Sequence, residues 1–161
     1  MRHLVRALSL LSLLCFAHLA QAADAEAIVD GYMAAWNAHD ADQAATFLAE
    51  DAVYFDATVG TPQNGKAAAR DNVIKVFVGA VPDLKWEMTS APIVSADGIA
   101  FQWKFSGTNS GDWSAETKAT GKPLSFEGVS FIRIKDGKIA YQGDYYDALG
   151  LSLIHISEPT R

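Results

Sequence analysis

Hydrophobic positions in the first half of the chain recur every three to four residues, the spacing of a helix with one buried face. This pattern predicts a helix over Ala25–Ala38, a short second helix capped by Asp40, and a third helix from about Lys66 to Pro82. Gln43 follows Asp40 by three residues, which is typical of a capped helix start. Between the second and third helices, Ala52–Asp56 is predicted to be a short strand.

In the second half of the chain the hydrophobic positions alternate with polar ones, which is typical of antiparallel strands with one buried face. The alternation predicts strands over Leu84–Thr89, Ile99–Phe105, Leu124–Ile134 and Lys138–Tyr146. The dipeptide Asp136-Gly137 is a strong hairpin signal between the last two. Helices followed by a run of strands favour the α+β class, with three N-terminal helices packed on a curved antiparallel sheet.

Two terminal segments are set apart from this domain. Residues 1–22 combine a basic start, the apolar run Ala7–Ala20 and a small-x-small site before Ala23, which are the parts of a secretory signal peptide. The sequence LSLIHISEPTR at residues 151–161 resembles a translated sequencing adapter. We therefore expect a periplasmic or secreted protein whose domain covers residues 23–150, followed by a non-native tail.

Charge, cysteine and histidine content narrow the possible functions. The chain has 13 basic and 19 acidic residues, a net charge of −6, and no basic stripe, so nucleic acid and anionic membrane surfaces are not expected partners. The single cysteine, Cys15, lies in the predicted signal peptide, which excludes thiol chemistry in the mature protein. His39 is the only histidine between the predicted ends and lies in a turn, so we expect no metal site and no cofactor.

Carboxylates and phenols remain as candidate acid–base groups. Asp56 shares a strand face with Tyr54, and a position in an enclosed cavity would raise the pKa of its carboxyl group. Such a group can transfer a proton near neutral pH. Asp56 could instead simply open the turn that follows. On the last strand Gln142, Asp144 and Tyr146 share a face, where they could line a pocket or cap a helical turn.

Two further features carry aromatic side chains. Tyr32 lies on the apolar stripe of the first helix, so its phenol is expected inside the domain, either as plain core or with a hydrogen-bond partner. The connection Ser106–Pro123 is too long for a simple hairpin and contains Trp113. It could be a lid over a binding site or a mobile surface loop.

Three stretches of the chain resemble known families. DGYMAAWNAHDADQAATFLAEDAVYFDATVG and NGKAAARDNVIKVF resemble the nuclear transport factor 2-like superfamily, and GTNSGDWSAETKATGKPLSFEGVSFIRIKDGKIAYQGDYYDALG is similar to SnoaL-like polyketide cyclases. The resemblance covers nearly all of residues 23–150. It implies a cone in which a bent sheet wraps three helices around an apolar pocket, a cystatin-like α+β barrel. This fold hosts isomerases, cyclases, dehydratases and dimerisation modules.

The first half is also similar to ketosteroid isomerase. Tyr32 matches that family's oxyanion-donating tyrosine and Asp56 its general-base aspartate. The family's protonated aspartic acid falls on Ser130, which can still donate a hydrogen bond. In SnoaL-like cyclases the acid–base aspartate lies near the last strand, where Asp144 matches it, and Gln142 stands where those enzymes often carry a histidine.

These observations predict a cofactor-free isomerase, cyclase or dehydratase that removes a proton next to a carbonyl group. Asp56 or Asp144 would be the base, while Tyr32 and Ser130 would stabilise the enolate oxygen. The alternative is a non-catalytic periplasmic module that binds a small hydrophobic ligand. The residues expected to shape the pocket and its lid are Trp36, Tyr54, Phe77, Phe101, Trp103, Trp113, Phe126, Gln142 and Tyr146.

The resemblance also implies an assembly. Members of this superfamily commonly dimerise through the outer face of the sheet, and Val129, Phe131 and Tyr145 place apolar side chains on that face. We therefore expect a homodimer. Its expected partner is a small apolar or carbonyl-containing molecule, with no nucleic acid and no membrane insertion after signal cleavage.

Overall fold

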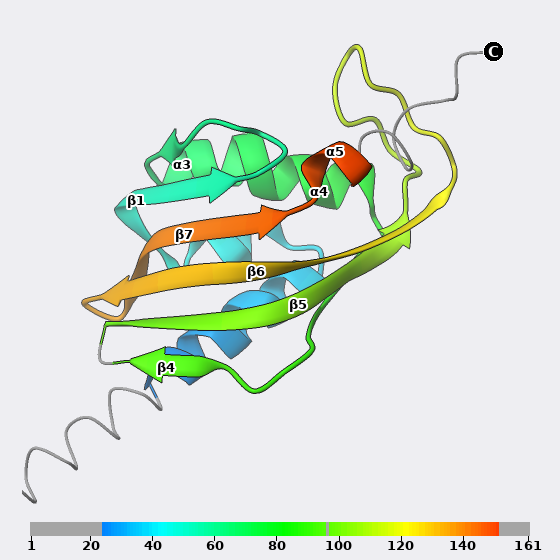
Figure 1. Cartoon of the computed structure of the whole chain (residues 1–161). Helices are drawn as coiled ribbons and strands as arrows, with labels where there is room; N and C mark the ends of the chain where they lie inside the picture. The colour runs from blue at the N-terminus through cyan, green and yellow to red at the C-terminus, as the bar shows by residue number, and fades with distance from the viewer. Residues whose placement is uncertain (1–23, 96, 152–161) are drawn as a thin grey trace, which may run out of the picture.

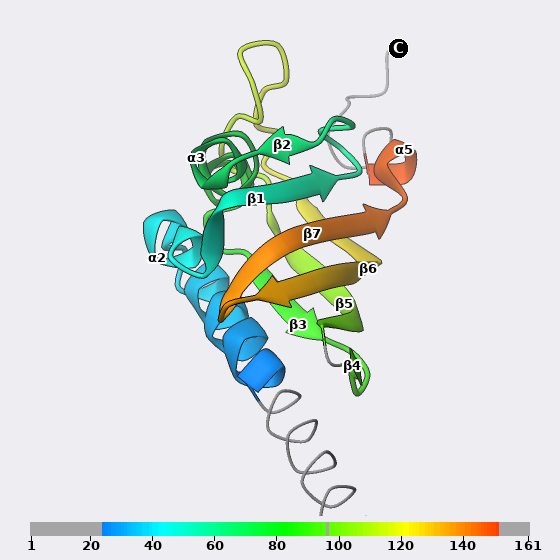
Figure 2. The ribbon, with the colours of Figure 1, turned by 90° about the vertical axis from the view of Figure 1, so that its left-hand side faces the viewer.

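A curved sheet with helices packed on one of its faces makes up the described part of the protein (Figures 1 and 2). The structure is a computed structural model that describes residues 24–95 and 97–151. The predicted signal peptide, residues 1–22, lies outside the described residues, as do residues 152–161 of the predicted tail. Leu151 is described: it ends α5 (Ala148–Leu151) and is buried. No helix in the described ranges is long and apolar enough to cross a membrane.

The first two helices form where the hydrophobic pattern predicts them. The first covers residues 24–37, and α2 covers Ala41–Ala45. The carboxylate of Asp40 caps α2, since its Oδ1 accepts a hydrogen bond from the backbone N–H of Gln43 at 2.8 Å. This bond satisfies one of the backbone donors that the first turn of a helix leaves unpaired. The predicted cap is confirmed.

The third helix begins at the predicted position but is not uniform. It consists of α3 (Lys66–Ala69), a π-helical segment η1 (Arg70–Ile74) and α4 (Lys75–Ala80). The wider π turn accommodates an extra residue per turn, and the neighbouring Val73 and Ile74 are both fully buried.

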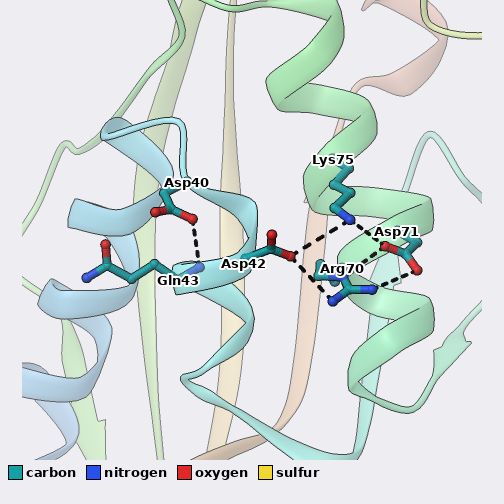
Figure 3. A network of polar contacts seen from close by, with 6 residues as sticks. All are labelled: Asp40, Asp42, Gln43, Arg70, Asp71 and Lys75. Carbon is teal, nitrogen blue, oxygen red and sulfur yellow. Dashed lines mark hydrogen bonds and ion pairs between the residues drawn. The ribbon is translucent and has the colours of Figure 1, made fainter.

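Charged side chains on the outside connect α2 to this third helix (Figure 3). Arg70 Nη1 lies 3.3 Å from Asp42 Oδ1, and Arg70 Nε donates to Asp71 Oδ1 at 2.8 Å. Lys75 Nζ lies 3.1 Å from the same Asp71 oxygen. The hydrogen bonds from Arg70 and Lys75 lower the pKa of Asp71 to about 2. We refer to Asp42, Arg70, Asp71 and Lys75 as the surface charge cluster.

Seven strands within the described residues form one open sheet, in the order β2-β1-β7-β6-β5-β3 with β4 on β5. All neighbours are antiparallel except β1 and β7, which run parallel and correct the expectation of a fully antiparallel sheet. Alternation along one strand does not reveal the direction of a strand that pairs from far away in the chain. The strands are β1 (Leu48–Asp56), β2 (Gln63–Asn64), β3 (Lys85–Met88), β4 (Ile93–Ser95), β5 (Gly98–Thr108), β6 (Pro123–Lys135) and β7 (Lys138–Tyr146).

The α+β class is confirmed, and the sheet curves around the helices without closing into a barrel (Figure 2). The predicted hairpin between β6 and β7 is also confirmed. Asp136 and Gly137 have φ angles of 52° and 71°, and this pair of positive values is what a two-residue hairpin turn requires. The two short strands β2 and β4 have too few residues to show an alternating pattern, and the sequence did not predict them.

Candidate acid–base site on the inner face of the sheet

Strand register brings polar side chains from three strands together. Asp56 on β1 pairs with Asp144 on β7, and Asp144 pairs with Ser130 on β6. Two residues further along, Tyr54 pairs with Gln142. Because residues two apart on a strand share a face, these side chains all lie on the inner face. All five are buried, so polar groups separated widely in the sequence form one cluster inside the domain.

Asp144 lies at the centre of this cluster and accepts hydrogen bonds on both carboxylate oxygens. The hydroxyl of Tyr54 donates to Oδ2 at 2.6 Å, and the hydroxyl of Ser130 donates to Oδ1 at 2.5 Å. Gln142 Nε2 donates to Oδ2 at 3.0 Å and to Oδ1 at 3.2 Å. Burial raises the pKa of Asp144 to about 7, although the bonds from Ser130 and Tyr54 act in the opposite direction.

The donors around Asp144 are themselves held by further donors. Trp103 Nε1 donates to Ser130 Oγ at 2.8 Å. An indole nitrogen can only donate, so Ser130 accepts from Trp103 and gives its own hydrogen to Asp144. In this arrangement the Ser130 hydroxyl has no hydrogen left for a ligand, in contrast to the oxyanion role predicted for it. Gln142 Nε2 similarly donates to the Tyr54 hydroxyl at 3.0 Å.

Gly128 gives the Trp103 ring the space it occupies. The two residues are partners on β6 and β5. A Cβ at Gly128 would lie 2.5 Å from the Trp103 ring and 2.8 Å from the backbone oxygen of Tyr145. The missing side chain therefore lets the indole lie across β6 and reach Ser130. The sequence analysis missed Gly128, and a glycine in the interior of a predicted strand was the signal that could have found it.

Asp56 is held differently. Its Oδ1 accepts hydrogen bonds from the backbone N–H groups of Thr58 at 2.8 Å and Val59 at 3.1 Å. The Tyr146 hydroxyl lies 3.0 Å from Oδ1 and 3.1 Å from Oδ2. Among the described residues, the only donor to Oδ2 is this Tyr146 hydroxyl, which it shares with Oδ1. Oδ2 can therefore accept a further hydrogen bond. Burial raises the pKa of Asp56. Asp56 thus opens the turn and is also buried, which combines the two alternatives predicted for it.

Asp56 and Asp144 line a narrow cavity between the sheet and the helices, with an empty volume of about 300 Å³ that includes space open to solvent. Tyr54 and Tyr146 line it beside the two carboxylates, and none of the described lining residues is Lys, Arg or His. The aromatic rings that form its other walls belong to Trp36, Phe77, Trp86, Trp103, Phe105 and Phe126. The sequence analysis did not include Trp86 and Phe105 in the site, although both lie on the buried face of predicted strands.

Tyr32 does not line this cavity. Its side chain is fully buried and packs edge-on against Trp36 and Trp86, with ring centroids 6.3 and 6.0 Å apart. Its hydroxyl has no hydrogen-bond partner in the described part of the chain. Its hydroxyl nevertheless lies near the polar cluster: burial is the largest cause that raises its pKa, and groups on Trp36 and Gln142 lower it. The oxyanion role of Tyr32 stays a prediction. Phe101 and Gln142 are likewise buried without lining the cavity.

The long connection between β5 and β6 is anchored to the end of α4. Asn109, which is fully buried, donates from Nδ2 to the backbone oxygens of Gly111 at 2.8 Å and Ala80 at 3.3 Å. Trp113 packs edge-on against Phe77, with ring centroids 5.0 Å apart. Since Phe77 lines the cavity and Trp113 does not, the loop supports the wall from outside. The sequence analysis missed Asn109, which carries no pattern that distinguishes it from a surface loop residue.

Comparison with known proteins places this chain in a family. A family model for the SnoaL-like domain matches residues 29–142, which is most of the chain. The chain belongs to the SnoaL-like family. This membership confirms the resemblance on which the predicted fold was based. A comparison with curated proteins gave no match.

Solved structures share the fold of this SnoaL-like domain. A protein described as a SnoaL-like polyketide cyclase, from Jannaschia sp. CCS1, is 15% identical with a TM-score of 0.73, over 86% of this chain and 94% of that chain. AclR of Streptomyces galilaeus, described as a hydroxylase, is 23% identical with a TM-score of 0.69, over 82% and 95%. A protein with a ketosteroid isomerase-like fold from Catenulispora acidiphila, in complex with trimethylamine, is 18% identical with a TM-score of 0.61, over 74% and 84%. At these identities the likeness shows the fold alone.

Proposed function

We propose that this SnoaL-like protein is a cofactor-independent enzyme that removes a proton from the carbon next to a carbonyl group. The reaction would be an isomerisation, a cyclisation or an elimination in a small molecule. The observation that carries the proposal is the pair of buried carboxylates, Asp56 and Asp144, on adjacent strands at one aromatic cavity. Because burial raises the pKa of both groups, they can exchange protons closer to neutral pH than ordinary carboxylates.

Asp56 is the better candidate for the base. A base must offer a lone pair to the hydrogen that it removes, and Oδ2 of Asp56 shares only the Tyr146 hydroxyl. Both oxygens of Asp144 already accept short bonds from Tyr54 and Ser130. In the proposed step the C–H proton moves to Asp56 Oδ2, while the electron pair of the broken bond forms an enolate. The protonated Asp56 then returns the proton to another carbon in an isomerisation, to the oxygen of the attacked carbonyl in a cyclisation, or to the leaving group in an elimination.

The enolate oxygen needs donors, and the cavity wall offers two. Once Asp56 is protonated, the Tyr146 hydroxyl no longer has to donate to it and can turn its hydrogen to the enolate. The Nε1–H of Trp36 is the second candidate, because Trp36 lines the cavity and this group has no partner among the described residues. One oriented donor to an oxyanion contributes about 3–4 kcal/mol to lowering a barrier. These two residues take the place of Tyr32 and Ser130 in the proposal.

Deuterium exchange tests the proposal without knowledge of the natural substrate. The α-protons of cyclopentanone in D₂O near neutral pD are followed by proton NMR, and ketone binding is followed by fluorescence of the cavity tryptophans. We expect the wild type to accelerate exchange and Asp56→Asn to lose about 10²–10⁴-fold of that acceleration. Asp71→Asn, in the surface charge cluster, is the matched control and should accelerate exchange of the ketone protons as much as the wild type does. Ketone binding without exchange faster than buffer would contradict the catalytic proposal.

That contradicting result would favour the alternative, a non-catalytic module for a small hydrophobic ligand. One observation supports this alternative: Asp144, Ser130 and Tyr54 satisfy one another and leave few free polar atoms in the narrow cavity. The same assay separates the two functions. A binding module retains ketone binding in Asp56→Asn and shows no exchange in either protein.

We also propose that residues 1–22 are removed on export. Support comes from the basic start, the apolar run and the small-x-small site before Ala23. Expression of the full chain in a bacterial host, followed by fractionation and intact-mass measurement, tests this. We expect a periplasmic or secreted form that begins at Ala23. A cytoplasmic form that retains Met1 would contradict the proposal.

A homodimer through the outer face of the sheet is the last part of the proposed function. Phe131 and Tyr145 are 56% and 46% exposed on that face, and their ring centroids lie 6.3 Å apart. Exposed neighbouring aromatic residues favour association with another protein surface. Light scattering coupled to size exclusion should show a dimer that Phe131→Lys converts to a monomer. A monomeric wild type would contradict this part of the proposal.

A further inference from the structure

The charges of the cavity lining are unbalanced. Asp56 and Asp144 both line it, and none of the described lining residues is basic. The ion pairs that the structure describes involve neither of these two carboxylates. Buried charges in proteins are normally paired with an opposite charge, because removal from water is costly. A positively charged ligand would supply the charge that the lining lacks.

The aromatic walls also suit a cation. The ring centroids of Trp36 and Trp86 lie 5.5 Å apart, with an angle of 60° between the ring planes. Those of Trp86 and Trp103 lie 6.3 Å apart, with an angle of 77° between the planes. The ring centroids of Phe126 and Trp103 lie 5.8 Å apart, with an angle of 78° between the ring planes. The rings pack edge to face in these pairs, and all four residues line the cavity. The face of an aromatic ring attracts a cation, and tryptophan attracts it most strongly.

The free capacity of one carboxylate oxygen gives the cation a defined place. Asp56 Oδ2 has only the Tyr146 hydroxyl as a partner among the described residues. An ammonium N–H can therefore donate to this oxygen while its alkyl groups contact the rings. The narrowness of the cavity favours a molecule of few carbon atoms.

We propose that the cavity binds a small organic ammonium ion, with its nitrogen beside Asp56 and its alkyl groups against Trp36, Trp86 and Trp103. This inference rests on the proposed use of the cavity as a ligand site, and it does not depend on the proton-abstraction step. It changes the expected ligand from a neutral apolar molecule to a compact amine. A substrate that combines an ammonium group with a carbonyl group would satisfy both proposals.

Two probes of the same shape test the role of charge. The tert-butylammonium ion and tert-butanol carry the same three methyl groups and a donor head, and they differ in charge. Their dissociation constants for the full chain are measured at pH 8 by titration calorimetry. We expect the ammonium ion to bind at least about 10-fold more tightly than the alcohol, since only the ammonium ion carries a charge that pairs with the buried Asp56 carboxylate. Equal or weaker binding of the ammonium ion, or no binding of it, would overturn the proposal.

Variants locate the binding. Asp56→Asn should reduce the preference for the ammonium ion to within about 3-fold of the alcohol, because it removes the charge that faces the nitrogen. Asp71→Asn removes a carboxylate from the surface charge cluster and should keep the full preference. An unchanged preference in a folded Asp56→Asn protein would place the cation elsewhere and overturn the proposal.

The outcomes of this test and of the exchange assay are independent. Ketone exchange together with equal binding of alcohol and ammonium ion would overturn only the ammonium inference. Preferential ammonium binding without ketone exchange would overturn only the proton-abstraction proposal.

Discussion

The acid–base site and the surface charge cluster both contain aspartates, but the two regions treat them in opposite ways. Asp71 lies on the surface with Arg70 and Lys75 beside it, and its pKa falls to about 2. Asp144 lies on the inner face with only neutral donors around it, and its pKa rises to about 7. Access to water and the charge of the neighbours set the acidity, and several neutral hydrogen bonds do not offset burial. Acid–base chemistry near neutral pH is therefore expected inside the domain.

The largest expected effect is on the pH dependence of stability. Because the pKa of Asp144 rises from 3.8 to about 7 on folding, the folded state holds a proton that the unfolded state has lost at intermediate pH. The resulting stabilisation is complete below about pH 4 and disappears as the pH rises through 7, a change on the order of 4 kcal/mol. Asp144→Asn lacks this ionisation.

Urea unfolding of the wild type and Asp144→Asn between pH 4 and 8 measures this effect. The stability of the wild type relative to the variant should fall as the pH rises. The comparison between the two proteins removes the contributions of groups that do not interact with Asp144. A difference that stays constant over this range would mean that Asp144 is not perturbed by burial.

The next effect concerns the packing that holds the donors of Asp144. Gly128→Ala places a Cβ against the Trp103 ring and should destabilise the fold by about 1–3 kcal/mol, because backbone limits relaxation on one side. Gly79→Ala is the matched control: its Cβ would meet no atom within 4 Å, and in a helix the exchange should be neutral or slightly stabilising. Urea unfolding measures both variants, and equal stabilities would show that Trp103 does not depend on Gly128.

A smaller effect isolates one hydrogen bond. Tyr54→Phe removes the hydroxyl that donates to Asp144 Oδ2 at 2.6 Å. Because this bond favours the ionised carboxylate, the pKa of Asp144 should rise further above 7, and the fold should lose about 1–3 kcal/mol. Tyr145→Phe, at an exposed position, should leave the pKa of Asp144 unchanged. Carbon-13 NMR titration of the carboxyl group measures the shift, and a lower pKa in Tyr54→Phe would contradict this role.

The smallest effect is expected in the surface charge cluster. Asp71 has a lowered pKa, so its contribution to stability is present above about pH 4 and is lost as the pH falls towards 2. This is the opposite direction from Asp144. Asp71→Asn should change stability little at pH 7, since exposed ion pairs contribute little. Unfolding curves at pH 3 and pH 7 test the sign, and a large loss at pH 7 would remove the contrast between the two regions.

Features with local causes could be predicted from the sequence. The cap formed by Asp40 and Gln43 and the hairpin turn at Asp136-Gly137 depend on neighbouring residues, and both form as predicted. The helical and alternating patterns also gave the α+β class. The candidate pair Asp56 and Asp144 came from strand faces and from the family resemblance.

Features that depend on pairing between distant strands could not be predicted. The parallel pairing of β1 with β7 places Asp56 beside Asp144, and no local pattern contains that register. The same holds for Trp103, whose hydrogen bond to Ser130 depends on the space left by Gly128 across the sheet. Tyr32 was expected at the site because the family resemblance matches it to a catalytic tyrosine, but it does not line the cavity and packs against Trp36 and Trp86, which do. Burial alone does not distinguish a cavity wall from the core behind it.

The most direct test of the account is carbon-13 NMR titration of the aspartate side-chain carboxyl groups in the wild-type protein. The account predicts a midpoint near 7 for Asp144, a midpoint above 3.8 for Asp56 and a midpoint near 2 for Asp71. If Asp56 and Asp144 both titrate at or below about 4, as exposed aspartates do, the inner face holds no perturbed acid and the proposed chemistry is wrong.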